Sequence, residues 1–250
     1  MLPVHVVGAD GCRAGWLAIK LAKEEDGGAT VFPTFAELWG ANRHAALILV
    51  DIPIGLRDEG PEARRCDQEA RKILGPRKPS VFPVPCRSAV YQPDYDAAIK
   101  ENRRLASKGI FRAVWQILPK IREVDALLQA NPSARQTVRE SHPEVCFWAL
   151  NSGKPMAYSK KTAAGIAERQ GLLTRVLARL SPRFRELLDR GSALLRPGVA
   201  PDDFLDALAL AVTAWLGLTQ GLSTLPPEPE KDAHGLPMEI VYVRLGPGAD

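Results

Sequence analysis

The chain has 250 residues with 46% hydrophobic content, which is enough for a real core, and it carries a formal net charge of +4. Its four cysteines lie far apart and form no C-x-x-C pair, which argues against a zinc ribbon and against a disulfide framework. The chain starts without a signal-peptide pattern and contains no apolar run of about 18 residues, so we expect a reduced, cytoplasmic protein.

The first fifty residues predict part of a sheet. Short β-branched runs at Val4–Ala9, Trp16–Leu21 and Thr30–Phe32 are separated by Gly-rich and polar turns, which favours an antiparallel meander. Phe35–His44 suits a short helix. The continuous apolar run Ala46–Val50 is typical of a strand that is buried on both faces.

The middle of the chain, residues 55–132, predicts a helical insertion within a single domain 1–250. Helices are expected at 61–74, 95–107 and 111–130, the last kinked at Pro119, and the proline-rich segment 76–93 is expected to be a structured loop. Between Arg64 and Arg112 there are twelve Lys and Arg but only five Asp and Glu. This local basic excess suits an anionic ligand, although such a cluster is more often a solvated face.

The last part of the chain completes an α/β layout with one mixed sheet. Gln136–Glu140 is the fifth strand candidate, and Met238–Arg244 is a further strand-like run. Helices are expected at 160–180, 182–194 and 201–218, with residues 226–229 a short stiff linker.

Acidic residues follow two of the predicted strands and begin the last helix. Asp10 comes directly after the first strand, and Asp51 ends the most apolar strand. Ligands of open α/β sheets bind beyond the carboxyl ends of the strands, so both acids lie where a site is expected. Taken singly, each also suits a turn or a backbone acceptor. Asp203 and Asp206 share one face of the helix, where a role in the helix dipole is the alternative.

A convergence of these carboxylates would favour a bound cation. Two like charges about 4 Å apart repel by about 4 kcal/mol at a surface-like dielectric. All-oxygen ligands suit Mg²⁺ or Mn²⁺. We therefore expect Asp203 and Asp206 to face a metal shared with Asp10 and Asp51, while Asp202 caps the helix.

Several motifs together carry a resemblance to a known family. They are Gly8-Ala-Asp-Gly-Cys-Arg-Ala-Gly-Trp16, Val50-Asp-Ile-Pro-Ile-Gly-Leu56, Arg65-Cys-Asp-x-x-Ala-Arg71, Ser80-Val-Phe-Pro-x-Pro85, Glu140-Ser-His-Pro-Glu144 and Asp203-x-x-Asp-Ala207. The chain resembles the predicted RNase H-like nucleases known as domain of unknown function 429. Its last helix is similar to that of RuvC-type Holliday-junction resolvases.

The resemblance implies both a fold and a reaction. The fold would be an RNase H-like mixed five-stranded sheet with flanking helices and a helical insertion after the fourth strand. The reaction would be metal-dependent phosphodiester hydrolysis with one or two divalent ions. Carried over by position, Asp10, Asp51 and Asp206 would be the core metal ligands, with Asp203 a second contributor.

The stretch around Glu140 leaves more than one role open. Glu140 ends the fifth strand candidate, so it could reach the same site as a ligand or as a base that orients water. His142 beside it could shuttle a proton, although a lone histidine is more often structural. Pro143 followed by Glu144 predicts the start of a helix.

Basic residues supply candidates for binding substrate phosphates, with solvated surface charge as the alternative for each. They are Arg64, Arg65, Arg77, Lys78, Arg87 and Lys160. We expect a nucleic acid partner of unspecified type, no membrane partner, and possible homodimers.

Two other functions compete with a nuclease. A non-catalytic protein that binds a nucleotide or a partner on the same fold is one alternative. An ATP-binding enzyme of the actin and Hsp70 type is less favoured, because the turn Asp10-Gly-Cys-Arg13 lacks the expected Ser or Thr and the chain has no G-x-x-x-x-G-K-S/T loop.

Overall fold

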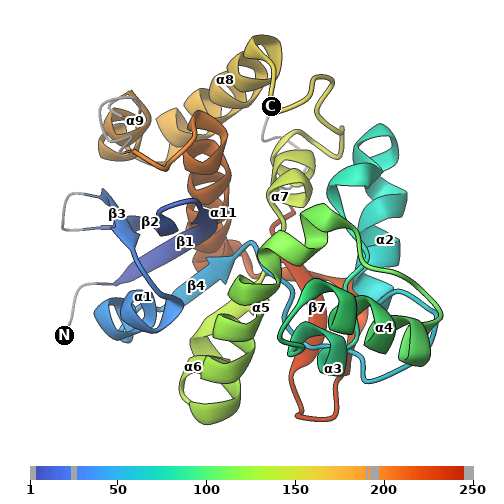
Figure 1. The fold of residues 1–250 in the computed structure, drawn as a ribbon. Coiled ribbons are helices and arrows are strands. Elements are labelled where there is room, and N and C mark those ends of the chain that lie inside the picture. Colours follow the sequence, from blue (N-terminus) through green and yellow to red (C-terminus); the bar gives the residue numbers. More distant parts are fainter. Residues whose placement is uncertain (1–3, 24–26, 190, 192–196, 245–250) are drawn as a thin grey trace.

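The computed structural model describes residues 4–23, 27–189, 191 and 197–244. These residues form an α/β fold with a five-stranded mixed sheet in the order β3-β2-β1-β4-β5, flanked by helices (Figure 1). No helix within these ranges is long and apolar enough to cross a membrane.

The predicted meander is confirmed, with β1 (His5–Cys12), β2 (Gly15–Ala22) and β3 (Gly28–Phe32) paired antiparallel. β4 (Leu47–Val50) and β5 (Val138–Glu140) continue the sheet parallel to β1. β1 is longer than predicted, because its pairing with β2 continues past Asp10 to a tight turn after Cys12. Asp10 therefore lies within the strand.

One face of the sheet is covered by helices from the C-terminal half of the chain. They are α7 (Pro143–Leu150), α8 (Ala163–Leu180), α9 (Pro182–Asp189) and α11 (Pro201–Gln220). Alternate strand residues such as Val6, Leu47 and Leu49 pack in this layer with the helices. The end of the helix predicted at 182–194 lies outside the described residues.

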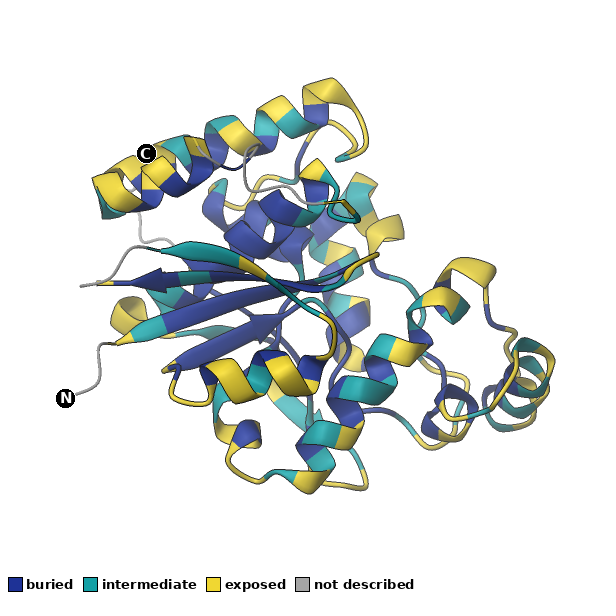
Figure 2. Cartoon of the chain, turned by 60° about the vertical axis from the view of Figure 1, so that its left-hand side comes forward, coloured by how far each residue is buried: buried dark blue, intermediate teal, exposed yellow. Residues whose placement is uncertain are grey.

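The other face is covered by α1 (Phe35–Asn42), α5 (Arg112–Ala130) and the short α6 (Ala134–Thr137). The strand residues between those of the first face, Val7, Ile48 and Val50 among them, pack against this second layer. Figure 2 shows the buried strands between the two layers of helices.

The segment 55–132 holds α2 (Arg65–Leu74), the 3-10 helix η1 (Gly75–Ser80), α3 (Arg87–Val90), α4 (Tyr95–Ala106) and α5. The proline-rich stretch 76–93 was expected to be a loop, but it contains most of η1 and all of α3. Pro119 lies inside α5 without ending it.

The predicted linker at residues 226–229 is wrong. It lies within β6 (Ser223–Lys231), which pairs with β7 (Pro237–Tyr242) as a second sheet. The pairing is irregular between Leu225 and Glu230, so the prolines fall where no ladder hydrogen bond is required. Val241 bridges Ser141, next to the end of β5, and α2 packs against this second sheet.

Candidate metal centre

The sheet brings Asp10 and Asp51 to the same place. Ala9 pairs with Val50 in the parallel ladder, and the Asp51 N–H donates to the Ala9 carbonyl at 3.0 Å. The two acids therefore occupy adjacent positions on neighbouring strands. Because side chains alternate between the faces of a sheet, both carboxylates lie on the face that α11 covers. Asp10 is buried, with 7% of its surface exposed.

Gly8 allows α11 to approach β1 closely. A Cβ atom on Gly8 would lie 2.2 Å from both the Ala207 carbonyl oxygen and the Ala211 nitrogen. The backbone of β1 is therefore in direct contact with the backbone of α11 at Gly8, which any side chain at this position would prevent. Gly8 lies two residues before Asp10 on the same face of the strand, so this contact carries the neighbouring Asp206 toward the two strand acids.

The pKa values reflect this convergence of carboxylates. Burial, followed by the charges of Asp51 and Asp206, raises the pKa of Asp10 well above its ordinary range. Burial raises the pKa of Asp206 to about 6, with a further increase from Asp51 and an opposing effect of Lys160. Burial also raises the pKa of Asp51. Their mutual repulsion makes this cluster a place for a cation.

Lys160 supplies a cation to the cluster. Its ammonium forms an ion pair with the Oδ2 of Asp206 and lies 4.0 Å from the Oδ2 of Asp202. Burial lowers the pKa of Lys160, but the charges of Asp206, Asp10 and Asp51 outweigh burial and raise it above its ordinary value. This lysine, which the sequence suggests as a phosphate ligand, thus also offsets the charge of the acids.

Two buried acceptor oxygens at this place lack a hydrogen-bond donor. They are the Oδ1 of Asp206 and the Oε2 of Glu144. The other Glu144 oxygen accepts from Arg169, whose side chain is completely buried. Buried oxygens without donors are costly unless a cation or water meets them, and an all-carboxylate set fits Mg²⁺ or Mn²⁺. Within the described part of the chain, however, no group of three or more His, Cys, Asp or Glu side chains is arranged to hold a metal ion.

Asp202 and Asp203 differ from the prediction in which of them caps the helix. The Asp203 carboxylate accepts the Ala200 N–H at 2.8 Å, so Asp203 caps the start of α11. Asp202 forms an ion pair with Lys161 at 2.6 Å. One Asp203 oxygen is thus engaged by its own helix, while the charge of Asp203 still acts on Asp10, and Asp202 is not the cap.

A cavity of about 220 Å³ opens beside the carboxylates. Asp10, Asp51 and Glu144 line it, together with Phe82 from the proline-rich segment. Lys120 of α5 lines it as well, and its ammonium donates to the Gly15 carbonyl at 2.5 Å. Lys120 was not selected from the sequence, because nothing there distinguishes it from the other lysines of the chain.

The family model described as Protein of unknown function (DUF429) matches residues 8–231, most of the chain and all the acids above. The chain belongs to this family. Comparisons with curated proteins and with solved structures gave no match.

In this DUF429 chain, Glu140 lies in a buried ion pair. Its two oxygens accept from Arg64, at 2.8 and 2.7 Å, and one of them also accepts the Ile54 N–H at 2.6 Å. Arg64 binds Asp67 as well, at 2.6 Å. Glu140 does not line the cavity beside Asp10, but it shares a smaller one with Asp51. His142 caps α7 by accepting the Glu144 N–H at 3.2 Å.

The basic candidates divide into buried and exposed groups. Arg64 is 2% exposed and fully engaged by carboxylates and carbonyls, so the structure does not bring it to the cavity. Arg87 is likewise buried in ion pairs with Asp125 and Asp232. These two arginines therefore stabilise the DUF429 fold instead of presenting free charge to phosphate.

The remaining basic candidates are less buried. Arg65 is exposed at the start of α2, and Lys78 is exposed in η1. Arg77 is partly buried and donates to the Ala157 carbonyl at 3.3 Å. Lys78 also lines a groove that begins at Phe82. Of the three, Lys78 is therefore the one that borders the same hollow as Phe82.

Proposed function

We propose that this protein is a metal-dependent nuclease that hydrolyses phosphodiester bonds. The observation that carries the proposal is the convergence of Asp10, Asp51 and Asp206 from segments far apart in the sequence. A buried Asp206 oxygen without a donor adds to it. The five-stranded mixed sheet, with acids on β1, after β4 and in α11, is the arrangement that an RNase H-like nuclease would need.

Asp10, Asp51 and Asp206 would hold the divalent ion, with Glu144 beside them. A bound Mg²⁺ or Mn²⁺ would activate water and stabilise the charge on the leaving oxygen. The carboxylates themselves need form no covalent bond. Asp10, Asp206 and Glu144 are buried, and charges attract each other more strongly in such a low-dielectric environment than in water.

Lys120 and Lys160 would position the phosphate. Both line the cavity beside the acids, and the Lys160 side chain is 34% exposed, so an anion can reach its ammonium. The Lys120 ammonium lies 4.6 Å from the centre of the Trp16 ring and donates to the backbone of β2, which fixes its position. Phe82 and Ile117 give the same cavity an apolar wall.

The test is a cleavage assay on labelled single-stranded, duplex, hybrid and branched nucleic acids with Mg²⁺, Mn²⁺ or EDTA. Asp10→Asn and Asp206→Asn are purified in parallel, with Asp202→Asn as the matched control on the same helix. We expect metal-dependent cleavage that both site variants lose and the control keeps. Cleavage that persists in Asp10→Asn and Asp206→Asn would refute the assignment of this site.

A non-catalytic role in binding a nucleotide or a partner is the second candidate. The ion pair of Lys160 with Asp206 favours it, because an internal ammonium already balances the carboxylates without a metal. The assay separates the two candidates when it is combined with calorimetric titration of Mg²⁺ and Mn²⁺. Absence of both metal binding and cleavage would select the non-catalytic role. ATP binding of the actin type is less favoured, because β1 leads into Cys12-Arg13 rather than a Ser or Thr turn.

A further inference from the structure

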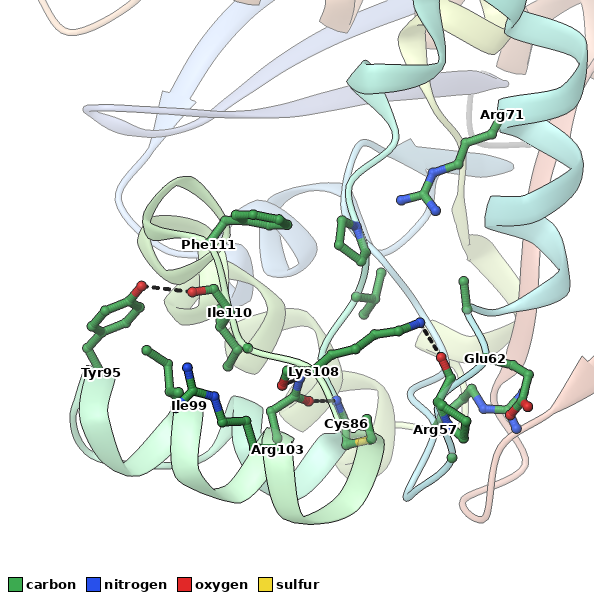
Figure 3. Close-up of a pocket in the computed structure, with 18 residues that line it drawn as sticks. Arg57, Glu62, Arg71, Cys86, Tyr95, Ile99, Arg103, Lys108, Ile110 and Phe111 are labelled. Atoms are coloured by element: carbon green, nitrogen blue, oxygen red, sulfur yellow. Dashed lines mark hydrogen bonds between the residues drawn. The ribbon is translucent and has the colours of Figure 1, made fainter.

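A second and larger cavity lies in the insertion, away from the carboxylates. It measures about 390 Å³, within the usual range for small-ligand pockets, and is enclosed by α4, the segment before α2 and the start of α5 (Figure 3). Its charged lining is mainly basic, with Arg57, Arg71, Arg103 and Lys108 against Glu62. Such a lining favours an anionic ligand.

This cavity continues toward the carboxylates. A shallower hollow of about 600 Å³ shares Arg71, Pro83 and Phe111 with it and adds Lys78 and Phe82. Phe82 in turn lines the cavity that holds Asp10 and Asp51. We call the path formed by Phe82, Lys78, Arg71, Phe111, Arg103 and Lys108 the basic groove. Phe82 is the residue that the hollow beside the acids shares with the next one, which in turn shares Arg71, Pro83 and Phe111 with the insertion cavity.

Aromatic rings accompany the positive charges. Phe111, which lines both hollows of the basic groove, is 68% exposed, although a ring of this size is normally buried. Figure 3 shows its ring above Ile110 at the edge of the cavity. Tyr95 is fixed by its hydroxyl, which donates to the Ile110 carbonyl at 2.8 Å, and by the Arg112 guanidinium stacked 4.1 Å from its ring centre.

Two basic side chains of the groove, Arg71 and Lys108, each donate one hydrogen bond to a backbone carbonyl. The Nε of Arg71 donates to the Val81 carbonyl at 2.8 Å, and Figure 3 shows the guanidinium extending from α2 toward the cavity. Arg103 and Lys108 are exposed, and Lys108 donates to the Pro61 carbonyl. Each keeps further N–H groups that a phosphate can accept from.

From this arrangement we infer that a single-stranded nucleic acid binds along the basic groove, with one base against Phe111 and its backbone along the cations. The inference rests on the proposed nuclease function, because the groove ends at the same carboxylates. A positively charged groove with an aromatic ring on which a base can stack is how proteins bind single strands with little dependence on sequence. A duplex keeps its bases stacked inside, so it has no base to offer Phe111.

The test measures binding in EDTA, where no metal-dependent cleavage takes place. A fluorescent single strand of about 12 nucleotides, either oligo-dT or oligo-U, is titrated by anisotropy, with the matching duplex as competitor. We expect Phe111→Ala to weaken single-strand binding at least about fivefold, the loss of one stacked base. Arg103→Gln should reduce the slope of log affinity against log salt by about 0.7.

Matched controls are Leu218→Ala, an exposed apolar residue on α11, and Arg183→Gln, an exposed arginine on α9. Neither lines the basic groove, so both should bind as the unmodified protein does. Equal binding by Phe111→Ala, or tighter binding of duplex than of single strand, would overturn the inference. Because binding is measured in EDTA, a protein that does not cleave can still confirm single-strand binding in the basic groove. Conversely, a protein that cleaves but binds single strands equally well without Phe111 refutes the basic groove and leaves the nuclease proposal standing.

Discussion

Gly8 of β1 lies against Ala207 of α11 so closely that a Cβ atom on the glycine would be 2.2 Å from the Ala207 carbonyl oxygen. We expect Gly8→Ala to lower the free energy of unfolding by about 3 kcal/mol or more, because helix and strand must separate to admit a methyl group. Urea unfolding measures the change. Gly40→Ala in α1 is the control, since nothing lies within 4 Å of its added Cβ. It should be neutral or stabilising, and equal stability of the two variants would contradict this account.

Arg64 holds two buried carboxylates, those of Asp67 and Glu140. We expect Arg64→Met to destabilise the protein by about 3–5 kcal/mol, because both acids then lose their buried partner. Arg65→Met, one residue later and exposed, should change stability by less than about 0.5 kcal/mol. Chemical unfolding of the two variants decides between a structural and a phosphate-binding role for Arg64. A stable, folded Arg64→Met protein with weakened nucleic acid binding would favour the second.

Lys160 balances the acids where the proposed metal would bind. Lys160→Met should therefore cost about 2 kcal/mol without metal, the loss of a hydrogen bond between charged groups. Millimolar Mg²⁺ should raise the melting temperature of this variant more than that of the unmodified protein, because no ammonium then competes for Asp206. Thermal unfolding with and without Mg²⁺ is the measurement. Lys161→Met, whose side chain is 68% exposed, serves as the neighbouring control and should show no gain in metal response.

The four cysteines are all free and buried. Burial raises the pKa of every one of them, that of Cys146 to about 11. Because the thiolate is the reactive form, we expect a chromogenic thiol reagent to modify almost none of them in the native protein at neutral pH and all of them in denaturant. Rapid modification of a thiol in the folded state would show that one of them is accessible.

The same thiols predict a loss of stability at alkaline pH. The folded pKa of Cys146 lies above the ordinary value of 9.0, so the native protein binds more protons than the unfolded chain in this range. The stabilisation that the protonated Cys146 thiol gives to the folded state is fully present below about pH 9 and is lost as the pH rises to about 11. Urea midpoints measured across this window should fall, and Cys146→Ala should fall less steeply. An identical decline in the variant would assign the effect to other groups.

The sequence was most informative where periodicity and burial coincide. The runs around Val6 and Ile48 predicted the strands of the central sheet, because residues buried on both faces leave a continuous apolar signal. The length of β1 was underestimated, since Asp10 and Gly11 interrupt that signal while backbone pairing to β2 continues. The strand β6 was missed because its prolines favour a linker. Its pairing depends on β7, and no pattern within β6 itself indicates that partner.

For the candidate site, the sequence predicted positions but not partners. Asp51 and Asp206 could be selected because a strand end and a helix start are recognisable locally, and Asp10 because it interrupts the apolar run of β1. The hydrogen bond from Ala200 to Asp203 and the ion pair of Arg64 with Glu140 depend on side-chain geometry, which the spacing of residues in the sequence does not indicate. Lys120 reaches the cavity only because α5 packs over Gly11, where an added Cβ would lie 2.6 Å from the lysine side chain.

The position of α11 along the chain has a consequence for how the protein forms during synthesis. β1 and β4 leave the ribosome long before α11, so the apolar face of the sheet that this helix covers stays open until residues 201–220 have been made. Contacts between such distant segments slow folding and expose nascent chains to aggregation. They also ensure that Asp206 joins Asp10 and Asp51 only after α11 has been made, so a translation product that stops before this helix cannot assemble the carboxylate cluster.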